Sequence, residues 1–443
     1  MTIPGYLSYK RTESGRVAQI PEHWSDGRLK DVLAASVTDG PHTTPEFLAD
    51  GVPFLSVDAI QNGELVLEGS RFISADDHTE FRRKAAPMYN DLLMGKAAST
   101  GKIARVKTEV EFSIWSPLAL IRIDKKKASP SYIEYALKST SVQAEIDNYC
   151  TANTQKNIGM VDIPKLRIVR PPLVEQRQIA DYLDAHAGKI DELIEKQERL
   201  IETLAERRQA VISHAVTKGL DPNAPMKDSG VDWLGEAPFS WPIVKVGYAY
   251  SVTVGKMLNA GKVPEDGEVV PYLRAANIQP EGLDLREVKQ MIVSAADSRS
   301  LELCRNDVVV VEGGGGYGRS DVLRDDLPGW VFQNHVLRVR PRRGDSSDFF
   351  NYLMKTINSN GHVASLSNHA TIPSISSEKL ASVRLGLPEV AVQNSIVVHL
   401  DRETAQIDAL SAKAREMIGI LKERRQALIS AAVTGKIDVR GLS

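Results

Sequence analysis

The chain has 443 residues and a formal net charge of −2; 42% of its residues are hydrophobic and 25% are charged. These values are typical of a globular protein with two or three domains. No run approaches the roughly 18 apolar residues that a membrane span needs, and the N-terminus lacks a signal-peptide pattern. Two cysteines, Cys150 and Cys304, are too few for a disulfide framework and lack metal-ligand spacing. We therefore expect a cytoplasmic protein without a structural metal or any membrane contact.

Short apolar runs such as Leu118–Ile123 and Val308–Val311 are typical of strands, and they alternate with helical patterns in two stretches of the chain. The sequence predicts an α+β fold of five segments: a mixed α/β head (1–170), a long helix (171–219), a Pro- and Asn-containing linker (220–237), a second mixed α/β head (238–387) and a second long helix (388–443).

The second half of the chain repeats the first. Residues 171–219 recur at 388–436 without a gap, so that Gln176 corresponds to Gln393, 217 positions later. A fainter match relates the heads, where Trp24 corresponds to Trp241. A repeat of this length indicates a duplicated module with pseudo-two-fold organisation. Since the heads keep only a framework, we expect the helices to do one job twice and the heads to do two different jobs.

Both long helices carry apolar residues at alternating spacings of four and three, which predicts a coiled coil. The first seam reads Ile179, Leu183, His186, Ile190, Leu193, Gln197, Leu200, Leu204, Arg207, Val211 and His214. In a parallel pair Arg207 would face Arg424, which is repulsive. An antiparallel pair brings Arg207 to Glu403 and His186 to Arg424, so we expect antiparallel helices, each roughly 57 Å long.

The sequence offers no catalytic centre. Residues 313–320 have the spacing of a phosphate-binding loop, but Arg319 stands where that loop needs lysine. The Asn/Asp-Pro-Pro-Tyr/Phe tetrapeptide of amino-methyltransferases does not occur. We therefore expect a chain that is not an enzyme by itself and that holds no cofactor.

The chain resembles the specificity subunits of type I restriction–modification enzymes. The resemblance covers essentially the whole chain and rests on Pro-Pro-Leu-Val-Glu-Gln-Arg-Gln-Ile at 171–179, on Glu-Arg-Arg-Gln-Ala at 206–210 and again at 423–427, and on the linker motif at 226–235. The second copy departs from the pattern at 389–392, where the helix begins.

The resemblance implies that each head is a target recognition domain that reads one half of a bipartite site in double-stranded DNA. It also implies that the helices set the spacer and dock two modification subunits, through which restriction subunits attach. Two alternatives stay open at this point: a coiled-coil scaffold that binds protein without reading DNA, and a stand-alone DNA adenine methyltransferase.

We expect DNA contacts from the loops after matched strands and from the segments that precede each helix. Glycine-rich loops allow close backbone approach, Arg and Lys reach guanine edges or phosphates, and Asn can pair with adenine. The residues expected to contact DNA are Lys96, Ser99, Thr100, Lys102, Arg105 and Lys156 in the first head, and Arg274, Asn277, Tyr317, Arg319, Asn334 and Ser374 in the second.

Overall fold

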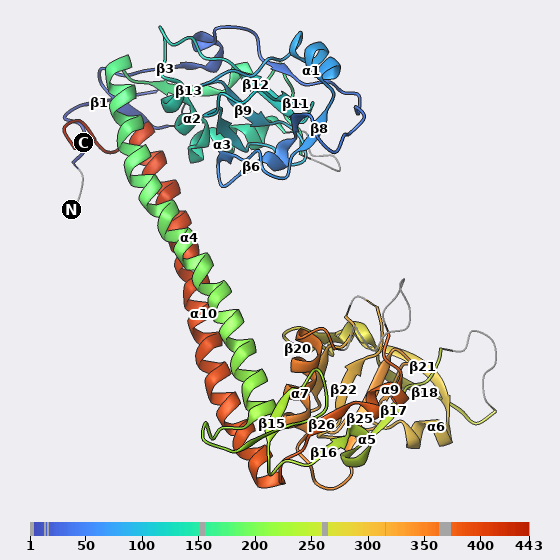
Figure 1. The fold of residues 1–443 in the computed structure, drawn as a ribbon. Helices are drawn as coiled ribbons and strands as arrows, with labels where there is room; N and C mark the ends of the chain where they lie inside the picture. Colours follow the sequence, from blue (N-terminus) through green and yellow to red (C-terminus); the bar gives the residue numbers. More distant parts are fainter. Residues whose placement is uncertain are drawn as a thin grey trace. The chain divides into compact units, whose positions relative to one another are not determined.

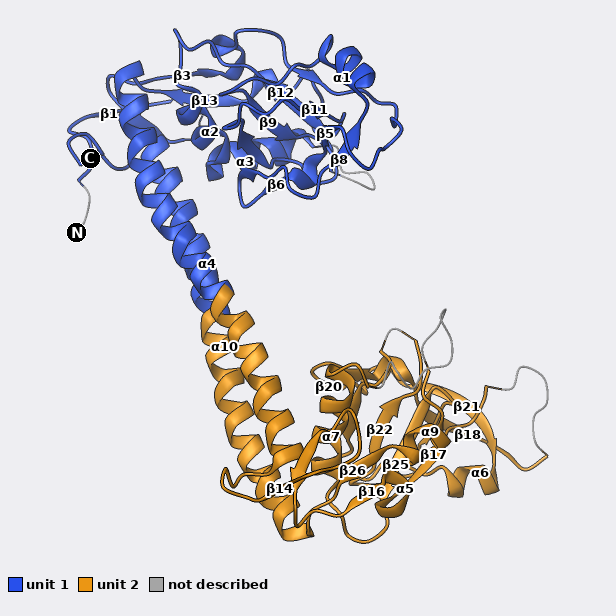
Figure 2. Ribbon diagram, viewed as in Figure 1, with its two compact units in different colours: residues 1–198, 415–443 blue, residues 199–414 orange. Residues whose placement is uncertain are grey.

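The computed structural model describes residues 4–12, 15, 17–150, 156–258, 265–314, 316–362 and 374–442. The chain divides into two compact units, unit 1 (residues 1–198 and 415–443) and unit 2 (residues 199–414), shown in Figure 2. Each unit contains one head and a part of each long helix (Figure 1). Within the described ranges, no helix is both long enough and apolar enough to span a membrane.

The head of unit 1 combines short strands with three short helices. Its helices are α1 (Ala75–Arg82), α2 (Pro130–Lys138) and α3 (Thr140–Tyr149). Its strands are β1 (Tyr9–Arg11), β2 (Gln19–Pro21), β3 (Ser25–Arg28), β4 (Thr38–Asp39), β5 (Val52–Leu55), β6 (Ile60–Gln61), β7 (Glu64–Leu65), β8 (Arg71–Ile73), β9 (Leu92–Gly95), β10 (Ile103–Arg105), β11 (Ser113–Ile114), β12 (Leu118–Ile121) and β13 (Arg167–Arg170).

The head of unit 2 has the same kinds of element in the same chain order. Its helices are α5 (Val246–Ala249), α6 (Ala295–Ser300), α7 (Ser347–Ser359) and α9 (Ser377–Ser382). Its strands are β14 (Met226–Asp228), β15 (Glu236–Pro238), β16 (Ile243–Lys245), β17 (Tyr250–Val254), β18 (Gly267–Leu273), β19 (Ile278–Gln279), β20 (Gly282–Leu283), β21 (Lys289–Ser294), β22 (Val308–Val311), β23 (Ser320–Val322), β24 (Val331–Phe332), β25 (Val336–Pro341) and β26 (Arg384–Gly386).

The sheets of the two heads correspond one to one. The four-stranded sheet β10-β9-β12-β4 of unit 1 matches β23-β22-β25-β17 of unit 2, and the three-stranded sheet β11-β5-β8 matches β24-β18-β21. The two-stranded sheets β13-β3 and β26-β16 also correspond. In both three-stranded sheets one pair is parallel and the other antiparallel. The predicted α+β class and internal repeat are therefore confirmed.

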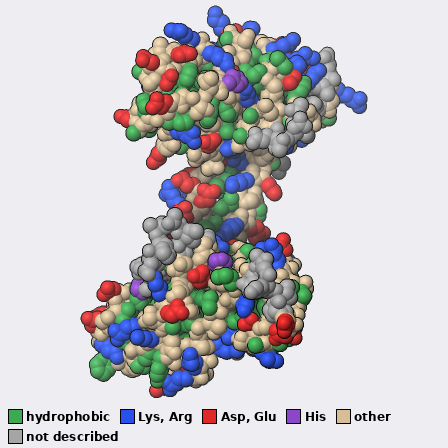
Figure 3. Space-filling model, turned by 90° about the vertical axis from the view of Figure 1, so that its right-hand side faces the viewer, with side chains coloured by type: hydrophobic (Ala, Val, Ile, Leu, Met, Phe, Trp, Pro, Cys, Tyr) green, Lys and Arg blue, Asp and Glu red, His purple; other side chains and the backbone are tan. Residues whose placement is uncertain are grey.

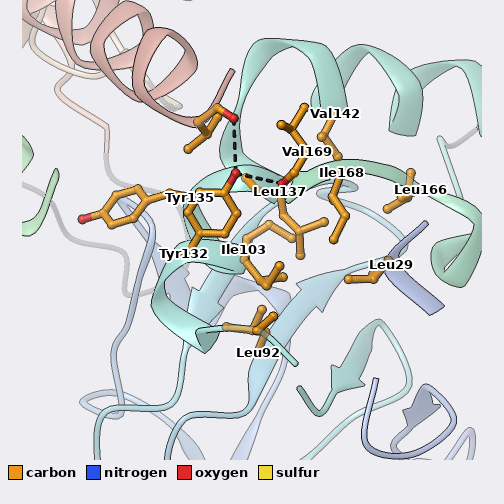
Figure 4. Packing of buried hydrophobic residues seen from close by; sticks show 14 of the residues in the cluster. Leu29, Leu92, Ile103, Tyr132, Tyr135, Leu137, Val142, Leu166, Ile168 and Val169 are labelled. Carbon is orange, nitrogen blue, oxygen red and sulfur yellow. Dashed lines mark hydrogen bonds between the residues drawn. The ribbon is translucent and has the colours of Figure 1, made fainter. Parts of the chain in front are cut away.

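The core of the first head lies between its four-stranded sheet and helix α2. Leu92, Ile103 and Leu137 are at most 2% exposed, because β9 is apolar on both faces and is covered on one of them by α2. Tyr132 is fully buried, and its hydroxyl donates to the carbonyl of Val169 at 2.8 Å (Figure 4). A buried phenol needs such a partner, since an unsatisfied hydroxyl would cost free energy.

Each long helix starts after proline and ends at glycine. The helices are α4 (Leu173–Lys218) and α10 (Val390–Val433). Gly219 and Gly435 follow them with φ of +78° and +72°, a conformation that glycine adopts without strain. A Cβ on Gly435 would lie 2.3 Å from Pro21 Cδ. The glycine therefore lets the end of the helix pack directly on the head.

Within each unit α4 and α10 pack along a seam that differs from the predicted one at alternate positions. In unit 1 Ile194 is 8% exposed and packs with Leu421, whereas the neighbouring Leu193 is 45% exposed. In unit 2 Ser411 is 9% exposed, whereas Leu410 is 51% exposed. Beyond Leu183 and Leu400 the predicted seam is thus wrong at every second position, where the next residue is more buried than the predicted one. Both readings keep alternating steps of four and three, so periodicity alone did not separate them.

One ion pair joins the two long helices in each unit. In unit 1 the Asp191 carboxylate lies 2.8 Å from Arg425 Nε, and in unit 2 Arg208 Nε lies 3.2 Å from Asp408 Oδ1. Asp191 precedes Arg208 on α4, whereas Arg425 follows Asp408 on α10, so the predicted antiparallel pairing is confirmed. The repeat relates Asp191 to Asp408 and Arg208 to Arg425. The two ion pairs are therefore two copies of one interaction.

The residues predicted to make these contacts were wrong by one position or more. Arg207 and Arg424 are exposed, and Glu403 pairs with Arg402 of its own helix at 3.3 Å. His186 stacks on Tyr182, with ring centroids 4.0 Å apart, and its Nδ1 lies 2.9 Å from the Tyr182 carbonyl oxygen. The second arginine of each Glu-Arg-Arg motif crosses to the other helix because the seam runs one residue later than predicted.

A buried amide fastens each head to the start of its long helix. Gln176 Oε1 accepts a hydrogen bond from Ser129 N at 2.9 Å, and Gln393 Oε1 accepts one from Ser346 N at 2.8 Å. Both glutamines are at most 2% exposed. The bonds hold the first turn of α2 and α7 against α4 and α10, so this anchor repeats along with the sequence.

A buried tyrosine on α2 and on α7 fastens each head a second time. The Tyr135 hydroxyl donates to Asp184 at 2.6 Å, and the Tyr352 hydroxyl donates to Asp401 at 2.7 Å. Burial, together with the bond to Asp401, raises the pKa of Tyr352 to about 12. The phenol therefore stays protonated and keeps donating through the physiological pH range.

We predict that reversing one charge of the helix-joining pair destabilises the chain and that reversing both restores it. Asp191→Arg would face Arg425, and we expect a loss of about 1 kcal/mol in unfolding free energy, since both side chains are partly exposed. The double variant Asp191→Arg, Arg425→Asp should regain most of it. Urea denaturation of the full chain measures both. The exposed pair Glu192–Lys196 supplies the control, because Lys196→Glu should change stability less; additive effects in the double variant would contradict the pairing.

Candidate nucleic-acid interface

In unit 1 three separate segments meet beside the end of β9. The loop that follows β9 receives a hydrogen bond from Ile158 N to the Lys96 carbonyl oxygen at 2.9 Å. The amide of Lys96 donates to the Pro117 carbonyl at 2.8 Å, and the amide of Ser116 donates to the Pro41 carbonyl at 3.2 Å. We call the surface formed by residues 40–44, 96–102 and 156–158 edge 1. The predicted loop and the predicted segment before the helix therefore lie together.

Unit 2 builds the same arrangement beside the end of β22. Ile375 N donates to the Glu312 carbonyl at 2.9 Å, which corresponds to the bond from Ile158 in unit 1. Asn334 N donates to the Lys256 carbonyl at 3.0 Å. We call the surface formed by residues 255–258, 312–319, 333–335 and 374–375 edge 2, with position 315 outside the described residues. Nine of the twelve predicted contact residues lie on edge 1 or edge 2; Arg105, Arg274 and Asn277 lie outside both.

In each head a glycine allows two backbone segments to approach closely. A Cβ on Gly40 would lie 1.8 Å from the Ile114 carbonyl oxygen, and a Cβ on Gly255 would lie 2.3 Å from the Gln333 carbonyl oxygen. Any side chain at these positions would collide with backbone. The sequence analysis did not single out these glycines, although their corresponding places in the two halves were a usable signal.

Lys96 is turned inward on edge 1. Its Nζ lies 2.6 Å from Asp39 Oδ2, and its side chain is 12% exposed. Lys84 binds the other oxygen of Asp39, and His42 Nε2 lies 3.2 Å from Asp39 Oδ2. Although burial opposes it, the bonds from Lys84 and Lys96 lower the pKa of Asp39 below its ordinary value. His42 and Lys84, which sequence reasoning missed, thus join Lys96 in a cluster with more positive than negative groups.

Three predicted residues of edge 1 lie nearer the surface than Lys96. Lys102 and Lys156 are exposed, and Thr100 holds the loop. Lys102 Nζ lies 3.1 Å from the Ile60 carbonyl, and Lys156 pairs with exposed Asp147 at 2.9 Å. The Thr100 hydroxyl donates to the Lys156 carbonyl at 2.7 Å, which ties the loop to the segment before the helix. Ser99 lies half-buried in the same loop.

Arg105 has a structural role instead. Its guanidinium binds Glu134 at 2.9 Å and Asn90 at 3.0 Å, and its side chain is 12% exposed. Glu134 is 2% exposed, so removing Arg105 would leave a buried carboxylate short of a partner. The sequence pattern could not reveal this, because the partner is distant in the chain.

Asn277 has a comparable role in unit 2. It is 4% exposed, its Oδ1 accepts from Arg274 N at 3.0 Å, and its Nδ2 donates to the Asp284 carbonyl at 2.7 Å. These bonds close the turn after β18, so the amide is already used within the head. Arg274 pairs with Glu287, and its side chain is 21% exposed.

Arg319 and Tyr317 lie half-buried on the loop between β22 and β23. The Arg319 guanidinium folds over Gly316, where a Cβ would lie 3.6 Å from Nη1. Ser374 bridges to Gly313, and Asn334 lies half-buried at the turn before β25. Edge 2 therefore differs from edge 1 in carrying Arg319, Tyr317 and Glu312, whereas lysine, histidine, amide and hydroxyl side chains occur on both edges.

On the face shown in Figure 3, basic and acidic side chains are interspersed over the coloured surface of each unit and do not gather in one broad patch. Among the described residues, no group of three or more His, Cys, Asp or Glu side chains could hold a metal ion. The two edges are thus distinguished by their individual side chains and not by a broad region of positive electrostatic potential.

The comparisons with known proteins agree with one another. The family model described as the type I restriction modification DNA specificity domain matches residues 21–203. The putative type I restriction enzyme MjaX specificity subunit of Methanocaldococcus jannaschii is 25% identical over 98% of this chain and 97% of that protein. The EcoKI specificity subunit of Escherichia coli is 20% identical over 95% of this chain and 91% of that protein.

Solved structures share the fold. A chain from a study of the assembly of a type I restriction–modification system has a TM-score of 0.69 at 16% identity, covering 94% of this chain and 99% of that one. The HsdS subunit of Thermoanaerobacter tengcongensis has a TM-score of 0.51 at 16% identity, covering 94% and 98%. Residues 21–203 thus match the DNA specificity domain of type I restriction–modification systems, and the chain is similar to their specificity subunits over nearly its whole length.

Proposed function

We propose that the chain is the DNA-reading subunit of a type I restriction–modification complex and that each head reads one half of a bipartite site. The observation that carries the proposal is the structural correspondence between edge 1 and edge 2. The same backbone scaffold occurs twice, with the same sheet orders, and it presents two different sets of side chains. Such a pair suits two different half-sites, since base edges are distinguished by donor and acceptor groups.

Within each edge we assign base and phosphate contact to polar side chains that are at least partly exposed. On edge 2 this favours Arg319, Tyr317 and Asn334, because guanidinium and amide groups can bind bases bidentately. On edge 1 it favours Lys102 and Lys156, whose ammonium groups suit phosphate. Arg105 and Asn277 are set aside, since their polar atoms are engaged within the heads.

The long helices supply the second part of the proposed function. Each of α4 and α10 is one continuous helix, so their length would set the number of base pairs between the half-sites. The repeat also leaves equivalent large apolar side chains exposed in both units: Leu193 and Met417 in unit 1, and Leu410 and Leu200 in unit 2. Exposed apolar side chains at equivalent positions indicate two similar protein-binding surfaces. We assign these to two modification subunits, which carry the methyl transfer and the attachment of restriction subunits.

Exchanging one head should change one half of the recognised sequence. Replacing residues 21–170 with the corresponding head of another specificity subunit keeps Gln176 and Asp184, the α4 partners of the head-to-helix anchors, while Ser129 and Tyr135 are exchanged with the head. Sequencing of methylated host DNA reads the new site. We expect a new half-site on one side, with the other half and the spacer unchanged. A change in both halves, or in neither, would contradict separate reading; methyl transfer by the chain alone would instead support the methyltransferase alternative.

Arg319→Ala should weaken DNA binding by about 1–3 kcal/mol and relax one half-site, if the guanidinium reads a base. If it binds phosphate, binding should weaken evenly across sequences with a shallower salt dependence. Gel-shift titration of the complex at several salt concentrations separates these results. Arg305→Ala is the matched control, because Arg305 is exposed before β22, at the other end of the strand from Arg319. Unchanged affinity, salt slope and methylation pattern would remove Arg319 from the interface.

Lysine on the exposed apolar positions should reduce the number of modification subunits bound. We expect Leu193→Lys with Met417→Lys to lower the ratio from two to one in native mass spectrometry, because burying an unpaired ammonium is unfavourable. The equivalent pair Leu200→Lys with Leu410→Lys should do the same. Val174→Lys, at another exposed position of α4, should leave two bound. A ratio of two in both double variants would place the docking surfaces elsewhere.

A further inference from the structure

Head 1 contains an aromatic hollow beside edge 1 that the proposed function does not use. The hollow has a volume of about 160 Å³, which is smaller than the roughly 300–1,000 Å³ of drug-sized ligand sites and so suits a single ring system. Phe54 and Trp115 line it, with ring centroids 5.9 Å apart. Phe47 lies next to both rings, and the Arg71 guanidinium lies 4.6 Å above the Phe47 ring. A planar ring could therefore stack there.

The rim of the hollow is polar. Ser56, Asp58 and Gln61 line it together with Glu68. Among the hydrogen bonds of the described residues, none involves the side chains of Asp58, Gln61 or Glu68, and all three residues are exposed. An aromatic wall facing free carboxylate and amide groups suits a flat ligand with amino donors, because carboxylates accept hydrogen bonds from amino groups and an amide can both donate and accept.

Residues 115–117 connect the hollow to edge 1. Trp115 N donates to the Leu55 carbonyl at 2.8 Å, and the next residue, Ser116, donates to the Pro41 carbonyl of edge 1 at 3.2 Å. The residue after that, Pro117, accepts from Lys96 N at 2.8 Å. A strand of nucleic acid held on edge 1 would therefore lie close to the mouth of the hollow.

Head 2 has different side chains at the equivalent place. Gln333 N donates to the Leu273 carbonyl at 2.9 Å, so Gln333 stands where head 1 has Trp115. Arg274 follows β18 as Ser56 follows β5, and its guanidinium reaches across to Glu287. Trp115 of the aromatic wall is thus replaced by an amide, and Ser56 is replaced by a long ion-paired side chain, although Tyr272 keeps an aromatic ring where head 1 has Phe54. The aromatic hollow is a feature of head 1.

We propose that this hollow binds one unstacked nucleobase with an exocyclic amino group (adenine, cytosine or guanine) against Trp115. This inference rests on the proposed DNA reading of head 1 for its source of bases, but the binding chemistry stands apart from it. A base in a continuous duplex stack does not expose its face, so the ligand is an unpaired base or a free nucleotide. Stacking supplies most of the affinity, and Asp58 and Gln61 select the amino group.

The test uses saturation-transfer NMR of the full chain with adenosine, cytidine and uridine monophosphates at up to about 10 mM, since stacking alone supports weak binding. We expect saturable binding of the adenine and cytosine nucleotides and at least fivefold weaker binding of the uracil nucleotide. Trp115→Leu should weaken binding at least fivefold, and Trp115→Phe should retain most of it. Ser56→Arg places in head 1 the arginine that head 2 carries as Arg274. This variant should abolish binding while leaving the fold intact.

Tyr89→Leu is the matched control, because Tyr89 is a 46% exposed aromatic residue that precedes β9, away from the hollow. Unchanged nucleotide binding in Ser56→Arg, or equal binding of all three nucleotides, would overturn the inference. A gel shift of the complex with its modification subunits, using duplex DNA and the same duplex carrying one unpaired adenine, distinguishes the sources of the base. A preference for the unpaired adenine that Ser56→Arg removes would assign the hollow to DNA; nucleotide binding without any duplex binding would support the hollow and contradict the proposed function.

Discussion

The ion pair between aspartate and arginine that joins the long helices determines how the repeated chain can fold. In a parallel pair in register, Asp191 would face Asp408 and Arg208 would face Arg425, because a repeated sequence places like residues opposite each other. In the antiparallel pair each aspartate faces an arginine, and the interaction forms once in each unit. Burial raises the pKa of Asp191 and Arg425 offsets part of this effect, so the pair acts more as a constraint on orientation and register than as a source of stability.

The sequence sufficed for the class of fold, the long helices and the antiparallel pairing, because these depend on repetition and on charge. It did not suffice for the seam. Leu193 and Ile194 are both large and apolar, and two overlapping stripes therefore satisfy the same spacing. The stripe that includes Ile194 is buried. The choice between them depends on the axial register of the partner helix, which no single helix encodes.

In the candidate site, too, the backbone arrangement was predictable and the roles of individual side chains were not. The loops after β9 and β22 and the segments before the long helices come together as expected, since matching positions in two copies must serve the same scaffold. Individual side chains were harder to assign. Arg105 and Asn277 have the chemistry of base contacts, yet their partners are Glu134 and the Asp284 carbonyl. A polar residue on a predicted loop cannot be assigned to a ligand until its long-range partners within the protein are known.

The head-to-helix anchors have a consequence for how such proteins diverge. The bonds from Tyr135 to Asp184 and from Ser129 to Gln176, like their copies in unit 2, lie in the interior of each unit, whereas the residues of edge 1 and edge 2 lie largely at its surface. Substitutions at the edges therefore do not remove the contacts that hold a head to its helix. Since most surface changes alter folding free energy little, selection can explore new edge residues without first acquiring compensating stability. The architecture would make a recognised sequence evolvable, because it separates the residues that we propose to select DNA from the contacts that hold each head to its helix.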